Sequence, residues 1–104
     1  MRSYRLSKIA DADLLSIFRY TLDTWGEDQL RIYLELFETA RDLIVENPFR
    51  PGSKPREDLA PGCHTFRTGK HYLVYRVNGT HIEIARILHE SMDFETQVTP
   101  ADFP

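Results

Sequence analysis

The sequence predicts a small α+β domain: an N-terminal strand, a helical hairpin and then a three-stranded antiparallel meander. Two observations predict this order. Apolar residues recur at helical spacing through the first half of the chain, and β-branched and aromatic residues, divided by glycine-containing turns, fill the second half. At 104 residues the chain can bury one adequate core. We therefore expect a single domain over residues 1–95 and a loose C-terminal tail over residues 96–104.

The chain begins with a short strand and a first helix. Tyr4 and Leu6 alternate at the period of a strand, so both side chains lie on one face. Ser7 or Asp11 can then cap a helix, because their side-chain oxygens accept hydrogen bonds from the unpaired amides of a first turn. Apolar residues at three- and four-residue spacing continue the helix over about 10–24.

A second helix follows after a very short link. Gly26 ends the first helix, and a new apolar stripe begins after Glu27 and continues to the stop at Pro48. Two helices joined by so short a link pack as a hairpin. Trp25 and Phe37 belong to these stripes, so we expect both side chains in the core. Replacing either with alanine would then cost about 3–5 kcal/mol.

The second half reads as a long loop followed by three strands. Prolines and glycines prevent a regular element over 47–62. Strands are expected over 63–68, 71–77 and 80–88, with Asn78-Gly79 suited to a tight hairpin turn. Both faces of the resulting sheet carry apolar side chains. Because an antiparallel sheet beside only two helices normally leaves one face in water, the second apolar face predicts a covering partner.

The charges are distributed unevenly along the chain. The net charge is −3 overall, with −3 over residues 1–46, +3 over 47–92 and −3 over 93–104. An acidic chain is a poor nonspecific nucleic-acid binder, because binding of this kind needs a basic surface. We therefore expect no direct nucleic-acid binding, while the positive middle can serve an acidic protein segment. The single cysteine and the lack of a long apolar run indicate a cytoplasmic protein without membrane contact.

The usual signatures of catalysis and metal binding are missing. His64 and His71 are seven residues apart, and His81 and His89 are eight apart, which matches no familiar metal-binding motif. Cys63 precedes His64, but adjacent residues of a strand point to opposite faces and cannot form a thiolate–imidazole pair. We expect a packing cysteine, no metal and no cofactor.

The most suggestive polar group is basic. Arg67, Arg76 and Arg86 lie on the three expected strands, with His71 and His89 nearby. Such a group could stabilise a phosphate in a transition state while a histidine moves a proton. Alternatively, this basic group faces water or an acidic partner, and we favour this second interpretation.

Residues spread through the chain are similar to a known family. They are Tyr4-Arg5-Leu6-Ser7, Ala10, Asp13-Leu14, Ile17, Tyr20-Thr21, Trp25-Gly26, Gln29, Tyr33, Asn47-Pro48, Pro61-Gly62, His71, Tyr75-Arg76, Arg86-Ile87-Leu88-His89 and Met92-Asp93. In order and spacing this set resembles the ParE toxins, one branch of the RelE/ParE toxin superfamily. The resemblance spans about residues 4–95.

The resemblance implies a function as well as the RelE/ParE toxin fold. It implies a type II toxin that inhibits DNA gyrase by direct binding, without catalysis, and that is neutralised by a ParD-type antitoxin in a toxin–antitoxin hetero-oligomer. The candidate target-binding residues are Arg86, His89, Met92 and Asp93. The candidate antitoxin-binding residues are Arg67, His71, Tyr72, Val74 and Arg76. Two alternatives stay open: a RelE-like ribosome-dependent mRNA endoribonuclease, or a relic that only binds antitoxin.

Overall fold

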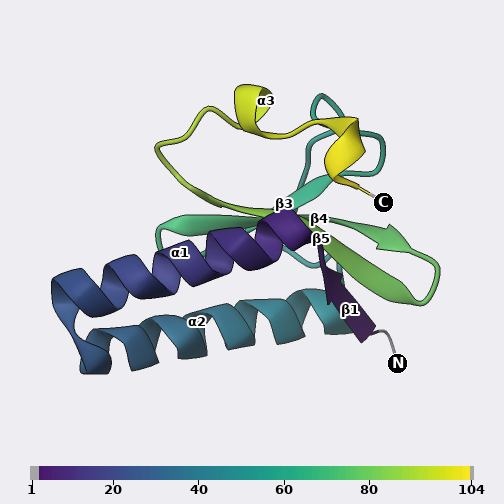
Figure 1. Cartoon of the computed structure of the whole chain (residues 1–104). Coiled ribbons are helices and arrows are strands. Elements are labelled where there is room, and N and C mark those ends of the chain that lie inside the picture. The colour runs from purple at the N-terminus through teal and green to yellow at the C-terminus, as the bar shows by residue number, and fades with distance from the viewer. Residues whose placement is uncertain (1–2, 104) are drawn as a thin grey trace.

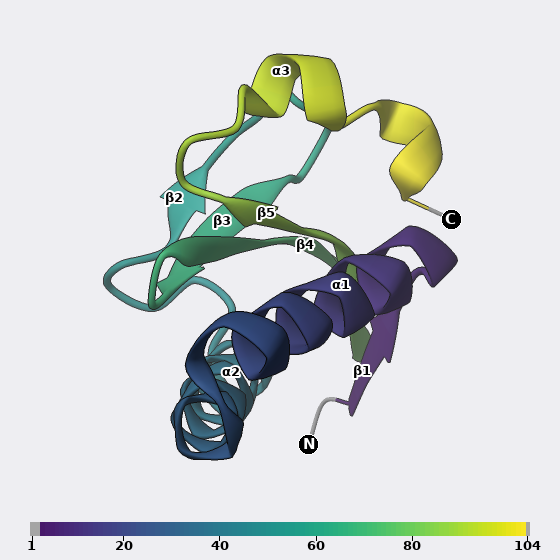
Figure 2. The same ribbon diagram turned by 60° about the vertical axis from the view of Figure 1, so that its left-hand side comes forward.

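The computed structural model describes residues 3–103 and has the predicted α+β order (Figure 1). Its elements are β1 (Ser3–Leu6), α1 (Lys8–Trp25), α2 (Glu27–Glu46), β2 (Lys54–Pro55), β3 (His64–Thr68), β4 (His71–Asn78), β5 (His81–His89), α3 (Phe94–Gln97) and a final 3₁₀ turn (Pro100–Asp102). The helical hairpin covers one face of the sheet, and the C-terminal residues lie on the other (Figure 2). None of the helices within residues 3–103 is long and apolar enough to cross a membrane.

The sheet contains five strands in the order β1-β5-β4-β3-β2. The predicted meander is confirmed as β3, β4 and β5, which pair antiparallel, while β1 runs parallel to β5. One strand was not expected, because the proline-rich loop forms the two-residue strand β2 against His64 and Thr65. The loop is held from inside the core, where the buried Tyr75 hydroxyl donates to the Pro48 carbonyl at 2.6 Å.

The helical hairpin follows the predicted stripes in part. Ser7 caps α1, since its Oγ accepts from the Ala10 amide at 2.9 Å, and Gly26 separates the helices at φ +91°, a conformation that favours glycine. Phe37 is buried as expected, with 4% of its surface exposed. The expectation for Trp25 is wrong, because 68% of this side chain is exposed. Trp25 lies at the turn of the hairpin, which extends past the sheet (Figure 1).

A β-bulge in β5 changes which residues share a face. Val74 pairs with Arg86 and Tyr75 pairs with Ile84, so Ala85 is the extra residue. Simple alternation predicts that Ile87 shares a face with Ala85, whereas in the structure Ile87 packs with Ile84 beneath the helices. After the bulge, Leu88 instead joins Ala85 on the opposite face.

The face of the sheet that points away from the helices is covered by the chain itself. We call it the second face, and it presents Val74, Ala85 and Leu88. The residues that cover it are Leu59, Ala60 and Cys63 from the loop and Phe94, Val98 and Phe103 from the C-terminal end. No partner is needed to bury this face, contrary to the sequence expectation. The prediction of a loose tail is also wrong for residues 96–103, because Val98 and Phe103 are buried.

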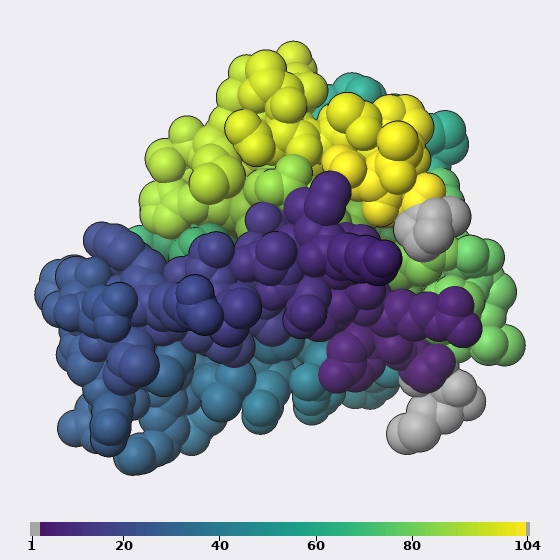
Figure 3. All heavy atoms as spheres, in the orientation of Figure 1, coloured from purple at the N-terminus to yellow at the C-terminus, as the bar shows by residue number. Residues whose placement is uncertain are grey.

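We call residues 94–103 the C-terminal strap. It comprises α3 and the 3₁₀ turn, and it lies across the upper part of the molecule beside the start of α1 (Figure 3). Asp93 starts α3, where its side chain accepts from the Glu95 amide at 3.1 Å. The 3₁₀ turn begins with a capping box between Thr99 and Asp102. Local caps of this kind order the strap although its helices are very short.

Candidate functional site

Two of the predicted histidines meet at one end of the sheet. His71 opens β4 and His89 closes β5, and these residues pair across the two strands. Their rings touch edge to face, with centroids 5.1 Å apart. The second helix reaches this point through Tyr33, whose hydroxyl is hydrogen-bonded to His71 Nδ1 and donates to the Thr68 carbonyl at 3.3 Å. Candidate residues assigned separately to target and antitoxin are therefore neighbours.

Burial shifts the pKa values of two members of this cluster, His71 and Tyr33. The pKa of His71 is lowered to about 4, mainly by burial and also by the nearby His89, while Glu90 opposes the shift. Burial also raises the pKa of Tyr33 above its usual range. At neutral pH His71 is thus an uncharged hydrogen-bonding group. This arrangement suits the docking of α2 onto the sheet better than proton transfer, which needs a pKa near the working pH.

The segment after β5 presents its side chains to solvent. Glu90 forms an ion pair with Arg67 across the sheet end, with Nη2 and Oε2 2.8 Å apart. Ser91 Oγ lies 2.7 Å from His89 Nδ1, which shapes the turn. Met92 follows with 46% of its surface exposed, which is high for a large apolar side chain. The exposed part of the predicted target-binding set is thus a short surface that continues to Asp93.

Arg86 lies deeper than the other candidate target residues. Its Nε and Nη2 donate to the two Asp13 carboxylate oxygens at 2.8 and 3.1 Å, and its Nη1 donates to the Gln97 carbonyl at 2.6 Å. The Asp13 carboxylate also accepts from the Ile87 amide at 3.0 Å. The hydrogen bond with Asp13 is the main cause that raises the pKa of Arg86. Arg86 therefore connects α1, β5 and the C-terminal strap within the chain.

The predicted antitoxin-binding residues divide into two groups. Arg67, His71 and Tyr72 lie near the exposed end of the sheet, and the Arg67 guanidinium sits over the Tyr72 ring at 5.7 Å. Val74 is completely buried on the second face, and Arg76 stacks over the Phe103 ring at 4.8 Å. The second group is therefore covered by the strap in this structure, and the strap also reaches Tyr72, whose ring centroid lies 5.5 Å from that of Phe94.

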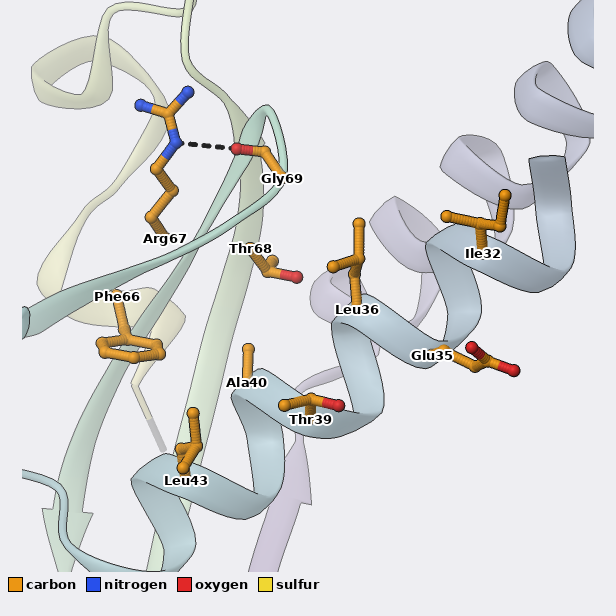
Figure 4. Close-up of a pocket in the computed structure, with 10 residues that line it drawn as sticks. All are labelled: Ile32, Glu35, Leu36, Thr39, Ala40, Leu43, Phe66, Arg67, Thr68 and Gly69. Atoms are coloured by element: carbon orange, nitrogen blue, oxygen red, sulfur yellow. Dashed lines mark hydrogen bonds between the residues drawn. The ribbon is translucent and has the colours of Figure 1, made fainter.

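A groove between α2 and β3 was not anticipated from the sequence. It has a volume of about 420 Å³. Its lining comprises Ile32, Glu35, Leu36, Thr39, Ala40, Leu43, Phe66, Arg67, Thr68 and Gly69. Figure 4 shows Leu43 on the side of Phe66 and Leu36 on the side of Thr68 and Gly69, whereas Arg67 points away from the helix and donates to the Gly69 carbonyl at 2.8 Å. The sequence offered one signal for this groove, because Leu36 is an apolar residue beside the buried stripe of α2. In the structure its side chain is 44% exposed.

The arginines that could stabilise a phosphate have different partners within the chain. Arg67 pairs with Glu90, Arg76 stacks over Phe103 and Arg86 pairs with Asp13, so the three guanidinium groups serve different partners. Cys63 is buried, which raises the pKa of its thiol to about 11 and keeps it protonated at neutral pH. Among residues 3–103, no three His, Cys, Asp or Glu side chains are grouped so that they could hold a metal ion.

Known toxins are similar to this chain over most of both sequences. The chain is 38% identical over 93 residues to Toxin ParE1 of Caulobacter vibrioides, covering 89% of this chain and 94% of that protein. It is 39% identical over 93 residues to Toxin ParE1 of Mycobacterium tuberculosis, covering 88% and 93%. It is 36% identical over 101 residues to Toxin ParE of Escherichia coli, covering 94% of each.

Solved structures share the fold at lower identity. The chromosomal ParDE TA system from P. aeruginosa contains a chain that superposes with a TM-score of 0.72 at 22% identity, covering 86% of this chain and 96% of that one. A chain of the toxin–antitoxin complex RelBE2 from Mycobacterium tuberculosis superposes with a TM-score of 0.62 at 24% identity, covering 85% and 96%. The family profile described as "ParE toxin of type II toxin-antitoxin system, parDE" matches residues 4–94. The chain belongs to the ParE toxin family of type II toxin–antitoxin systems.

Proposed function

We propose that this toxin inhibits DNA gyrase by direct binding and is neutralised by a ParD-type antitoxin in a toxin–antitoxin hetero-oligomer. The observation that carries the proposal is the family match over residues 4–94, which includes the exposed segment that closes the sheet. Binding is the simpler mode of action, because the arginines that would hold a phosphate are each engaged within the chain. The proposal places the protein in the cytoplasm with its target.

The proposed target surface is the segment from His89 to Asp93. Met92 offers an exposed apolar anchor beside the polar side chains of Glu90 and Ser91, a combination typical of an interface. We assign Arg86 a supporting role, since its pairing with Asp13 holds β5 behind this segment. Direct contact of Arg86 with gyrase would require the Arg86–Asp13 ion pair to break.

The proposed antitoxin surface is the groove between α2 and β3, with Arg67 and His71 at its end, while Tyr72 lies on the other side of the sheet beside Phe94. The groove offers exposed apolar side chains, and the outer edge of β3 beyond Thr65 has no neighbouring strand within residues 3–103. A free strand edge beside an apolar groove suits an extended or helical partner segment. Val74 and Arg76 would become available to the same partner only if the C-terminal strap moves.

Two assays on purified, antitoxin-free protein test the proposed activity. We expect inhibition of gyrase supercoiling and no cleavage of ribosome-bound message. Message cleavage without gyrase inhibition would assign the chain to the RelE-like nucleases. No effect in either assay would indicate a protein that only binds antitoxin.

Single substitutions separate the two surfaces. Met92→Ala should weaken gyrase inhibition about tenfold, because an exposed anchor at the centre of a contact contributes on the order of 1–2 kcal/mol. Leu36→Glu should instead weaken antitoxin binding and leave gyrase inhibition intact. Leu15→Glu, a matched change at an exposed apolar position of α1, should alter neither. Equal loss of both activities in the Met92 and Leu36 variants would contradict two separate surfaces.

A further inference from the structure

The turn of the helical hairpin carries an exposed tryptophan that the core does not use. Trp25 is the only tryptophan of the chain and is 68% exposed, and Leu22, one helical turn earlier, is 41% exposed. Side chains three positions apart lie on the same face of a helix, so these two form one apolar surface. We call residues 22–28 the hairpin tip. Exposure of its tryptophan contributes nothing to folding, and tryptophan is enriched among the residues that dominate binding at interfaces.

The charged side chains of the hairpin tip are all acidic. Residues 20–30 contain three carboxylates, those of Asp23, Glu27 and Asp28, and no lysine, arginine or histidine. Glu27 and Asp28 lie in the first turn of α2, where a negative charge stabilises a helix. Asp23 lies in the last turn of α1, where a negative charge is unfavourable and no basic residue offsets it. Helix stability therefore does not explain Asp23.

These carboxylates are available to a partner. Asp28 lies 3.8 Å from Arg31, and both side chains are largely exposed. The ion pairs within residues 3–103 include neither Asp23 nor Glu27. The hairpin tip thus combines an apolar surface with uncompensated negative charge.

The hairpin tip and the proposed target surface lie at the same end of the molecule. Helix α1 runs alongside the second half of β5, because Ser7 Oγ donates to the Ala85 carbonyl at 2.7 Å and the Asp13 carboxylate accepts from the Ile87 amide at 3.0 Å. The two elements therefore run in the same direction. Figure 1 shows the hairpin turn and the chain that follows β5 on the same, left-hand side.

Helix α2 connects the two surfaces. Its Tyr33 hydroxyl is hydrogen-bonded to His71, whose ring contacts that of His89 at the start of the proposed target surface. Tyr33 lies seven residues after Gly26, which corresponds to about 10 Å along a helix axis. The hairpin tip thus extends past the sheet on the side where the target segment is exposed.

We propose that the hairpin tip is a second contact with the target protein, in which Trp25 and Leu22 enter an apolar pocket bordered by basic residues. The inference rests on the proposed function for the identity of the target, gyrase. An enzyme that binds DNA needs a basic surface to neutralise phosphates. The acidic charge around Trp25 is complementary to such a surface.

The single tryptophan provides a direct test. Fluorotryptophan incorporated into the toxin gives one fluorine NMR signal, which reports on position 25 alone. Addition of unlabelled gyrase should shift this signal and protect it from a soluble paramagnetic agent, while co-sedimentation measures binding separately. Binding with an unchanged, unprotected signal would overturn this inference and leave the proposed function standing. Absence of binding would overturn both.

Substitutions measure the contribution of each feature. Trp25→Ala should weaken affinity for gyrase at least about tenfold, with a melting temperature near that of wild type because the side chain is exposed. Asp23→Asn should weaken affinity about two- to fivefold at low salt and have little effect at high salt. The control Phe49→Ala removes another exposed aromatic ring, beyond the opposite end of α2, and should bind like wild type. Wild-type gyrase affinity in Trp25→Ala, or a loss of antitoxin binding in its place, would contradict the proposed contact.

Discussion

Removing the Asp13 carboxylate tests how far Arg86 belongs to the fold. Arg86 and Asp13 side chains are only 14% and 17% exposed, and two charge-assisted hydrogen bonds of 2.8 and 3.1 Å join them. Removing one member of a buried pair costs about 3–5 kcal/mol, because the other charge is left without a partner. Since this pair retains some contact with water, we expect Asp13→Ala to lower the free energy of unfolding by about 3 kcal/mol. The melting temperature should fall by about 12–24 °C.

Urea unfolding and calorimetry measure this effect, and an exposed ion pair provides the control. Asp28 lies 3.8 Å from Arg31, and the two side chains are 97% and 70% exposed. Asp28→Ala should therefore change the free energy of unfolding by no more than about 0.5 kcal/mol. A decrease of less than about 1 kcal/mol in the free energy of unfolding of Asp13→Ala would refute this reasoning. Arg86 would then be available for contact with a target.

Three further predictions concern stability. Phe37→Ala should lower the free energy of unfolding, measured in urea, by about 3–5 kcal/mol, because this side chain is buried. Trp25→Ala at the exposed hairpin turn should lower it by less than about 1 kcal/mol. Similar decreases for the two variants would show that the turn is packed. The pKa of His71 is about 4 in the folded protein, below its ordinary value of 6.5. Stability should thus be intact above pH 6.5 and fall toward pH 4 by about 1–2 kcal/mol after solvent screening. His71→Gln should flatten this part of the pH curve, and an unchanged slope would contradict the assignment. Tyr75→Phe removes the 2.6 Å bond to Pro48 and should cost about 1–3 kcal/mol, whereas the exposed Tyr20→Phe should be neutral in the same thermal melts.

The polar residues of the candidate site could be named from the sequence, but their accessibility could not. His71 was expected at the start of one strand and His89 just after the end of the next. In the structure β5 extends to His89, so the two residues pair and their rings meet. The bulge at Ala85 gave no local signal, although it reverses the faces of all later residues in β5. The α2–β3 groove was missed because it forms between two elements that are distant in the chain.

The sequence by itself determined the order of the main elements, a polar cap at the start of the first helix, the hairpin at Gly26 and the family. These properties follow from spacing, capping and turn chemistry, which act over a few residues. Tertiary structure alone decided which charges are available to partners. Asp13 and Arg86 are 73 residues apart, and their pairing depends on how α1 lies against β5. Likewise, the acidic C-terminal residues reveal their place only once the sheet presents arginines and an apolar face for them to cover.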